Sequence, residues 1–270
     1  LVEAMEAVAS DVHITVALPP IMRVNGQLKP MRDYKFTPEQ TAKICYSMLN
    51  DKQRDILEEK GEVDFSYGIP NISRFRVNVY RQRKSLTAAI RIIVTNIPTL
   101  ESLGFPPVMQ ELAMKPRGLI LVTGPTGSGK STTLAAMVDY VNQTTDRHII
   151  TLEEPIEYLH RHSKSMINQR EIGDDSLTFA NGLRAALRED PDVILVGEMR
   201  DLETISTAIS AAETGHLVMS TLHTTSAPQT IDRIIDVFPP YQQTQVRVQL
   251  ASVLQGIVAQ QLLLTTNGKG

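Results

Sequence analysis

A glycine-rich stretch between a short apolar run and a helical segment constrains this chain more than any other feature. Residues 118–131 read Gly-Leu-Ile-Leu-Val-Thr-Gly-Pro-Thr-Gly-Ser-Gly-Lys-Ser, and residues 124–131 match the pattern G-x-x-x-x-G-K-[ST] in full. The apolar residues before the motif predict a buried strand, and the residues after it predict a helix, which is the context the motif requires. The sequence therefore predicts a strand, a phosphate-binding loop and a helix in an α/β protein.

The residue types of this loop suit a nucleoside triphosphate. Glycines let backbone N–H groups approach phosphate oxygens, and the N-terminus of the following helix adds partial positive charge. Lys130 is expected to reach the β- and γ-phosphates, and Ser131 to coordinate Mg²⁺. The alternative is a chance glycine turn, which both flanking elements argue against. The residues expected to bind nucleotide are Gly124, Pro125, Thr126, Gly127, Ser128, Gly129, Lys130, Ser131 and Thr132.

The second half of the chain alternates short apolar runs with helical segments. Continuous apolar runs separated by helices indicate strands covered on both faces, and hence a parallel sheet. The runs lie at 119–122, 149–152, 193–196 and 217–219. The helical candidates lie at about 130–142, 177–188 and 201–213.

The first hundred residues have the pattern of a small α+β domain. Residues 11–16 alternate as a strand does, and Asn25-Gly26 predicts a hairpin turn. Thr37-Pro-Glu-Gln predicts a capped start for a helix over 39–50. Two further strands are expected at 74–81 and 86–94. Prolines and glycines gather near 95–107, so we expect domains at 1–97 and 106–270, joined by a linker at 98–105.

Two acidic groups follow predicted strands. Glu198 comes directly after the run Asp192-Val-Ile-Leu-Val-Gly, and is expected at the carboxyl edge of the sheet, beside the phosphate loop, where open α/β sheets bind ligands. The other group comprises Glu153, Glu154 and Glu157. Any of its carboxylates could polarise a water molecule, and spacing alone does not choose among them; an acid-rich helix start is the alternative.

Two histidines flank the apolar run that begins at Leu217. His216 and His223 are seven residues apart, which corresponds to roughly 20 Å along an extended strand and rules out one shared metal ion. His223 is expected at the phosphate end, where it could sense the γ-phosphate or contact a neighbouring subunit. An ordinary structural histidine is the alternative for both positions.

A stretch without acidic side chains lies in the first domain. No aspartate or glutamate occurs between Asp64 and Glu101, whereas six basic residues do: Arg74, Arg76, Arg81, Arg83, Lys84 and Arg91. A solvated basic face is one interpretation. The absence of carboxylates favours a surface that meets an anion.

The amino-acid composition excludes several classes of protein. The chain has 270 residues, enough for two domains, and a formal net charge of −3, which does not favour a nucleic-acid coat. Cys45 is the single cysteine, so an internal disulfide framework and a multi-cysteine zinc site are excluded. No apolar run approaches the length of a membrane span, and Glu3 and Glu6 argue against a signal peptide. We therefore expect a cytoplasmic protein.

Four sequence blocks together resemble the secretion ATPase superfamily and, within it, the PilT-like retraction ATPases of type IV pili. The resemblance runs from Ala9 to Gln260, and the phosphate loop alone would not carry it. The blocks are Gly-Pro-Thr-Gly-Ser-Gly-Lys-Ser at 124–131, Glu-Glu-Pro-Ile-Glu at 153–157, Leu-Arg-Glu-Asp-Pro-Asp-Val-Ile-Leu-Val-Gly-Glu-Met-Arg-Asp at 187–201, and Thr-Gly-His-Leu-Val-Met-Ser-Thr-Leu-His-Thr at 214–224.

This resemblance implies a PAS-like N-terminal domain, a RecA-like core and a homohexameric ring that uses ATP and Mg²⁺. It implies that Glu198 is the Walker B glutamate, which holds Mg²⁺ directly or through water, and that Glu157 activates water. His216 and His223 match the family's His box, which implies that His216 binds nucleotide and that His223 takes part in catalysis. Arg76 and Arg91 match arginines that reach the γ-phosphate. Arg81 and Arg83 are weaker candidates for that role.

Two departures from the family pattern concern hydrolysis and motor function. Glu154 stands where the family usually has aspartate, which lengthens the side chain by one methylene. The family continues beyond the position of Gly270, so we expect the C-terminal part of the family core, which carries a segment tied to retraction, to be absent.

The leading hypothesis is a motor that disassembles a pilus at the cytoplasmic face of the inner membrane, acting on a platform protein there. Pilus extension or secretion ATPases are the alternative within the family, although these commonly carry a four-cysteine zinc motif that a single cysteine cannot build. A nucleic-acid translocase and a nucleotide switch with little turnover are minor alternatives; we expect no direct nucleic-acid partner.

Overall fold

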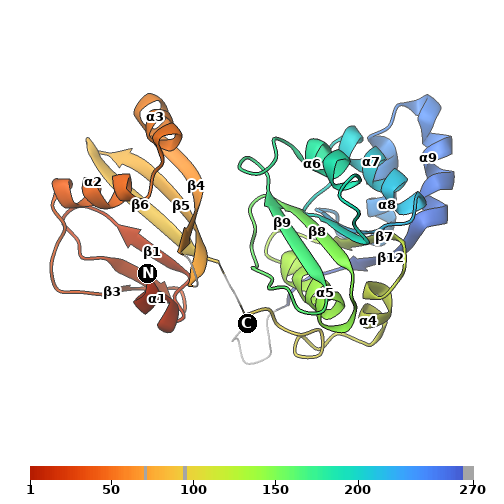
Figure 1. Cartoon of the computed structure of the whole chain (residues 1–270), viewed down its shortest axis with the longest axis horizontal. Helices are drawn as coiled ribbons and strands as arrows, with labels where there is room; N and C mark the ends of the chain where they lie inside the picture. Colours follow the sequence, from red (N-terminus) through yellow and green to blue (C-terminus); the bar gives the residue numbers. More distant parts are fainter. Residues whose placement is uncertain (70–71, 94–95, 264–270) are drawn as a thin grey trace. The chain divides into compact units, whose positions relative to one another are not determined.

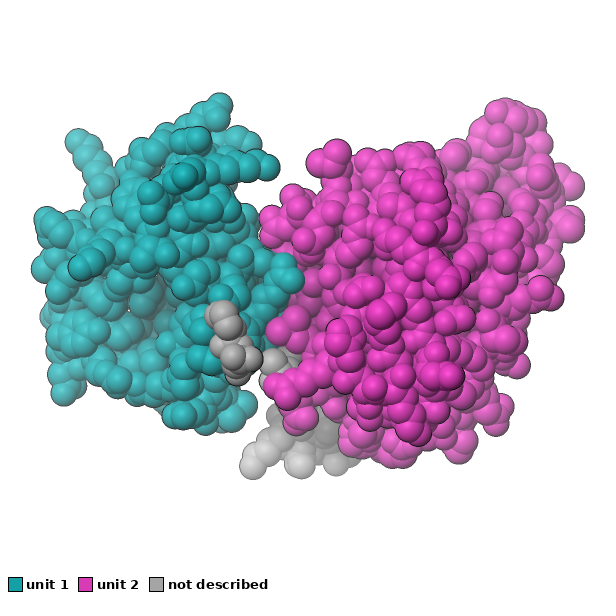
Figure 2. All heavy atoms as spheres, in the orientation of Figure 1, with its two compact units in different colours: residues 1–95 teal, residues 96–270 magenta. Residues whose placement is uncertain are grey.

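The computed structural model describes residues 1–69, 72–93 and 96–263. Residue 94 of the strand predicted at 86–94 and residues 264–270 of the predicted core lie outside these ranges. The chain divides into two compact units, residues 1–95 and 96–270 (Figure 2). The sequence pattern placed a linker at 98–105, yet Leu100 is only 2% exposed and packs in the core of unit 2 with Met109 and Ala113.

Unit 1 is an antiparallel sheet with helices on one face (Figure 1). The strand order is β3-β2-β1-β6-β5-β4. Buried Cys45 and Leu57 from two helices pack against Phe75 and Val77 of the sheet. The elements are α1 (Val2–Glu6), β1 (Asp11–Ile14), β2 (Ile21–Val24), β3 (Gln27–Pro30), α2 (Pro38–Ser47), α3 (Asp51–Lys60), β4 (Glu62–Ile69), β5 (Ser73–Gln82) and β6 (Ser85–Ile92).

Two predictions for unit 1 are confirmed: the hairpin turn at Asn25-Gly26 and the capped helix start at Thr37. Asn25 and Gly26 adopt φ values of 50° and 77° in the turn that joins β2 to β3. The Thr37 side chain accepts from the backbone N–H of Gln40, whose side chain caps the Thr37 N–H in return. These interactions fix the hairpin and the start of α2.

The prediction of one helix over 39–50 is wrong at its C-terminal end. Helix α2 ends at Ser47, and Asn50 opens a separate helix, α3, through its own capping box with Gln53. Helix α3 buries Leu57 alone among its ten residues, so its sequence carries little helical periodicity. Neither α3 nor β4, which follows it, was predicted.

Unit 2 is built on a second six-stranded sheet in which every pairing is parallel, in the order β12-β7-β11-β10-β8-β9. Its elements are α4 (Val108–Ala113), β7 (Gly118–Thr123), α5 (Lys130–Thr144), β8 (His148–Glu153), β9 (Met166–Glu171), α6 (Phe179–Ala186), β10 (Val193–Val196), α7 (Leu202–Glu213), β11 (Leu217–Leu222), α8 (Ala227–Asp236), α9 (Pro240–Val253) and β12 (Leu254–Ala259).

Apolar side chains cover both faces of this sheet. Along β7, Leu119 and Leu121 pack with helices α6 to α9, whereas Ile120 and Val122 pack with α4 and α5. The two sets of helices lie on opposite sides of the sheet in Figure 1. The predicted parallel α/β core is therefore confirmed. Within the described ranges, no helix combines the length and the apolarity that crossing a membrane requires.

Gly118 provides a test of how tightly β7 packs at its first residue. Its φ is +121°, and a Cβ atom there would lie 2.7 Å from the backbone oxygen of Val253. Gly215 has nearly the same φ, +119°, but a Cβ atom there would meet nothing within 4 Å. Gly215→Ala should therefore cost only backbone strain, about 1–3 kcal/mol.

Gly118→Ala should cost that strain plus about 1–3 kcal/mol for the backbone clash. Urea unfolding of both variants and the wild type measures the free energies of unfolding. Equal losses in the two variants would contradict the packing described at Gly118.

Candidate active site at the carboxyl edge of the parallel sheet

The phosphate loop joins β7 to α5 as predicted. Gly124 at its start has φ +148°, and a Cβ atom there would clash with the Gln260 backbone oxygen, so only glycine fits. Helix α5 begins at Lys130 after Gly129, and no side chain caps it. Its first backbone N–H groups therefore have no capping partner and can bind an anion.

A cavity of about 590 Å³ lies against this loop. It is lined by Thr126, Gly127, Gly129, Lys130, Ser131 and Thr132 from the loop and α5, by Glu157 and Tyr158 from the segment after β8, and by Glu198, Arg200 and His223 from the ends of β10 and β11. Three predicted loop residues do not line it: Gly124, Pro125 and Ser128, of which Ser128 is 3% exposed.

Lys130 lines the cavity and has both carbonyl and carboxylate groups around its ammonium group. Its Nζ donates to the carbonyl oxygens of Gly124 at 2.9 Å and Pro125 at 3.0 Å. Burial lowers the pKa of Lys130, while the nearby carboxylates of Glu157 and Glu198 act to raise it. The lysine is thus a mostly buried cation facing two acidic side chains, and phosphate oxygens could replace its carbonyl partners.

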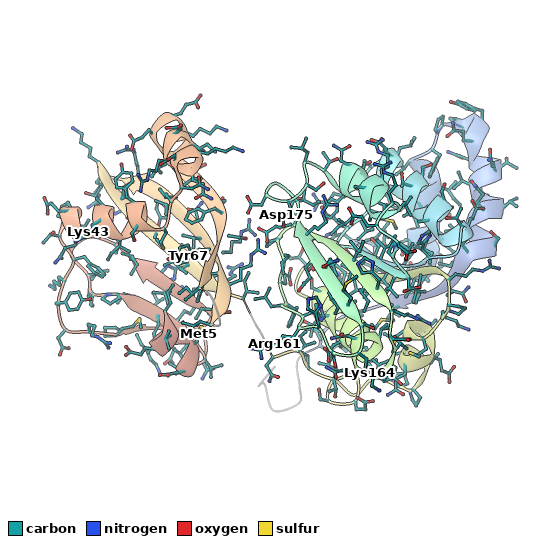
Figure 3. The ribbon with its side chains drawn as sticks, viewed as in Figure 1. Met5, Lys43, Tyr67, Arg161, Lys164 and Asp175 are labelled. Atoms are coloured by element: carbon teal, nitrogen blue, oxygen red, sulfur yellow. The ribbon has the colours of Figure 1, made fainter. Side chains whose placement is uncertain are left out.

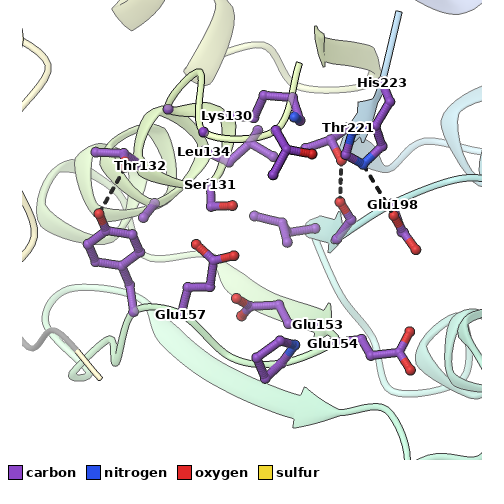
Figure 4. Close-up of a pocket in the computed structure, with 18 of the residues that line it drawn as sticks. Lys130, Ser131, Thr132, Leu134, Glu153, Glu154, Glu157, Glu198, Thr221 and His223 are labelled. Carbon is purple, nitrogen blue, oxygen red and sulfur yellow. Dashed lines mark hydrogen bonds and ion pairs between the residues drawn. The ribbon is translucent and has the colours of Figure 1, made fainter. Parts of the chain in front are cut away.

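Glu198 follows β10, and its carboxylate is held by two basic side chains. Arg200 Nε lies 2.7 Å from Glu198 Oε1. His223 Nε2 lies 3.6 Å from Glu198 Oε2, the contact drawn as a dashed line in Figure 4. Thr221 Oγ1 donates to the Gly197 carbonyl at 2.6 Å, which ties the end of β10 to β11. The Arg200 guanidinium was not predicted as part of the site; its position two residues after Glu198 is the one sequence signal for it.

The three glutamates at and after the end of β8 all line the cavity, but Glu153 and Glu157 differ in their surroundings. Glu153 turns inward and accepts from Thr151 Oγ1 at 2.6 Å and Gln169 Nε2 at 3.1 Å. Burial raises the pKa of Glu153, although these hydrogen bonds and one from the Glu157 N–H act in the opposite direction. Glu157 is exposed in the cavity, and its carboxylate points toward Ser131 in Figure 4.

The two histidines lie at opposite ends of β11. His223 reaches the cavity, as expected. His216 precedes the strand, its Nδ1 lies 2.9 Å from the Ala211 carbonyl oxygen, and it does not line the cavity. The structure therefore does not bring His216 to the phosphate loop, because the length of β11 separates it from His223 at the cavity.

Arg76 and Arg91 belong to unit 1, whereas the cavity belongs to unit 2. They are cross-strand partners on β5 and β6, directly opposite each other, and both are exposed. Arg91 Nε pairs with Asp11 Oδ1 at 3.2 Å. Arg81 instead pairs with Glu58 at 2.5 Å, and no ion pair links Arg83 to a carboxylate among the described residues.

Comparison with known proteins shows which family this chain belongs to. Residues 1–267 match the Type II/IV secretion system protein family. The chain belongs to this family. Among its relatives, the type IV pilus retraction ATPase PilT of Pseudomonas aeruginosa is 51% identical over 96% of this chain and 76% of its own length. A twitching motility protein of Neisseria gonorrhoeae is also 51% identical, over 93% of this chain and 67% of its own length.

A solved structure supports the same family assignment. The pilus retraction motor PilT with bound ADP matches with a TM-score of 0.92 and 56% identity, over 98% of this chain and 78% of the other. The predicted resemblance to PilT-like ATPases is thereby confirmed, and so is the predicted fold class, an α/β RecA-like core with an α+β domain before it.

His160 makes the cavity wall sensitive to pH. It lines the cavity, and its Nδ1 is buried and makes no hydrogen bond within the described residues. Burial lowers the pKa of His160 to about 4, whereas an unfolded histidine has a pKa of about 6.5. As the pH falls below about 6.5, histidine in the unfolded chain binds a proton while His160 in the folded chain does not. The free energy of unfolding therefore decreases as the pH falls from about 6.5 to about 4.

Substituting a group that does not titrate should remove this dependence. Between pH 7 and pH 5, the wild type should lose about 2 kcal/mol more of its free energy of unfolding than His160→Gln. Urea unfolding at both pH values measures the difference. Parallel losses in the two proteins would show that His160 is not buried in its neutral form.

Proposed function

We propose that this chain hydrolyses ATP to power retraction of type IV pili, as the names of its relatives indicate for those proteins. One observation carries the proposal: a single cavity brings the Lys130 ammonium and the uncapped start of α5 together with the carboxylates of Glu157 and Glu198. A phosphate-binding loop facing acidic side chains suits phosphoryl transfer to water better than binding alone.

Each group has a role that follows from its position. The N–H groups of the loop and of α5, together with Lys130, hold the phosphates. Hard oxygen ligands suit Mg²⁺, and Ser131 and Glu198 line the cavity with such oxygens, Glu198 acting directly or through water. Mg²⁺, when bound, neutralises phosphate charge. Glu157 accepts the proton of the attacking water, and His223, beside Glu198, meets the γ-phosphate end.

Arg76 and Arg91 supply positive charge for the transition state in this proposal. Like charges directly opposite on neighbouring strands destabilise a sheet, and Asp11 offsets only Arg91. An anion bound beside Arg76 would relieve the repulsion. We place these arginines at the γ-phosphate bound by a neighbouring subunit in a homohexameric ring that acts on an inner-membrane platform protein.

Pilus extension or secretion is the second candidate function. A type II secretion system protein E of Aeromonas hydrophila is 38% identical, over 53% of its own length. The higher identity to the retraction ATPase and to the twitching motility protein favours retraction, as does Cys45 being the single cysteine.

Turnover against protein concentration tests the proposal. We expect Mg²⁺-dependent ATP turnover that rises as hexamers form. Sedimentation of the same samples measures the fraction of hexamer. Glu157→Gln should keep ADP binding and lower turnover at least about 100-fold, because the water loses its base. Arg76→Ala should lower turnover only where the ring forms. Normal turnover in Glu157→Gln, or turnover independent of assembly, would contradict the proposal.

A further inference from the structure

The segment that carries Glu157 has no regular secondary structure, yet side chains of β9 hold it on both sides. After β8 the chain continues through Glu157 and then through Arg161 and Lys164, the two residues of this segment that Figure 3 labels, before β9 begins. Strand β9 was not predicted from the sequence. Two of its side chains, Gln169 and Glu171, point back at the segment and bond its backbone.

Gln169 makes three hydrogen bonds with its one amide group, two to the backbone of the segment and one to the Glu153 side chain. Its Nε2 donates to Glu153 Oε1 at 3.1 Å and to the Tyr158 carbonyl oxygen at 2.9 Å. Its Oε1 accepts the backbone N–H of His160 at 2.8 Å. Both N–H donors and the oxygen are therefore used, and the contacts bracket Glu157 from four residues before it to three residues after it.

The register of the sheet explains why Gln169 can reach all three partners. Strand β9 pairs in parallel with β8, with Gln169 directly beside Thr151. Thr151 Oγ1 donates to the same Glu153 oxygen that Gln169 contacts. Gln169 thus joins the last residue of β8, a strand whose residues pack in the core, to the segment that follows.

Other contacts orient the segment toward the phosphate loop. The Tyr158 hydroxyl lies 2.9 Å from Thr132 Oγ1, in the first turn of α5. Glu171 Oε2 accepts the Ile156 N–H at 3.2 Å. Glu157 lies between these two attachment points: the backbone of Ile156 is bonded from β9, and the side chain of Tyr158 contacts α5.

We propose that Gln169 is the positioning residue that holds Glu157 in place for hydrolysis, acting through the backbone of residues 158–160 and through Glu153. The inference rests on the proposed role of Glu157 in ATP hydrolysis. Gln169 itself does not line the cavity and touches no phosphate-loop residue in the described contacts. Its effect should therefore fall on kcat and leave nucleotide affinity unchanged.

The chemistry of the contacts selects the substitutions. Leucine has nearly the shape of glutamine but neither donates nor accepts. Glutamate can accept from His160 but places an acceptor against Glu153 and the Tyr158 carbonyl. Asn168→Leu is the matched control: it removes an amide from the same strand, but the Asn168 side chain is exposed and contacts His148 instead.

Kinetics of the full chain test the proposal. Gln169→Leu and Gln169→Glu should lower kcat about 10- to 100-fold, since small displacements of a reacting group are costly. KM for ATP and Kd for ADP should change less than about twofold, and Asn168→Leu should behave as the wild type. In the Glu157→Gln background, Gln169→Leu should cause no further loss, because the group it positions is already gone.

Hydrogen exchange supplies a readout that does not depend on turnover. The His160 amide and the peptide 154–160 should exchange faster in Gln169→Leu than in the wild type and in Asn168→Leu, with ADP affinity unchanged. Unchanged exchange would overturn the proposal, and so would additive losses in the double variant, which indicate a general structural role.

The same variants separate the two levels of inference. If Glu157→Gln retains full turnover, the assignment of Glu157 fails, whatever Gln169 does. If Glu157→Gln is inactive while Gln169→Leu retains full kcat, the hydrolytic site stands and the role of Gln169 fails.

Discussion

The mostly buried ammonium group of Lys130 is the constraint around which unit 2 is arranged. Removing a cation from water is costly unless partners stabilise its charge, and Lys130 finds them in two loop carbonyls and in the carboxylates of Glu157 and Glu198. A parallel sheet brings these groups together, because the carboxyl ends of its strands share one edge. The same arrangement that stabilises the lysine leaves a cavity whose wall carries both signs of charge.

The acidic side of that cavity is built by two different means. Glu198 sits at the end of a buried strand, and its carboxylate is fixed by Arg200 and His223. Glu157 lies in an irregular segment, whose backbone bonds side chains of β9 and whose Tyr158 hydroxyl contacts Thr132 of α5. Strand β9 is an edge strand of the sheet, and its Gln169 and Glu171 side chains bond the backbone of this segment.

How far the sequence predicts the site depends on the range of the interactions involved. The phosphate loop and its helix are predictable, because glycine spacing and the flanking apolar run act within about fifteen residues. The choice among Glu153, Glu154 and Glu157 is not, because all three line the cavity and differ only in their contacts, such as the hydrogen bond from Gln169 to Glu153, which no sequence pattern indicates. The failure of His216 to reach the cavity follows from the length of β11. The pairing of Arg76 with Arg91 needs the register of β5 and β6, which spacing alone does not supply.

The central claim is that the cavity beside Lys130 binds nucleotide phosphates, and equilibrium titration of the chain with ADP and Mg²⁺ tests it most directly. Calorimetry of the wild type and of Lys130→Ala gives the two dissociation constants. We expect saturable binding to the wild type and at least about a hundredfold weaker binding to Lys130→Ala, because the phosphates lose a charge-assisted partner. Equal affinity in the two proteins, or no binding to either, would contradict the account.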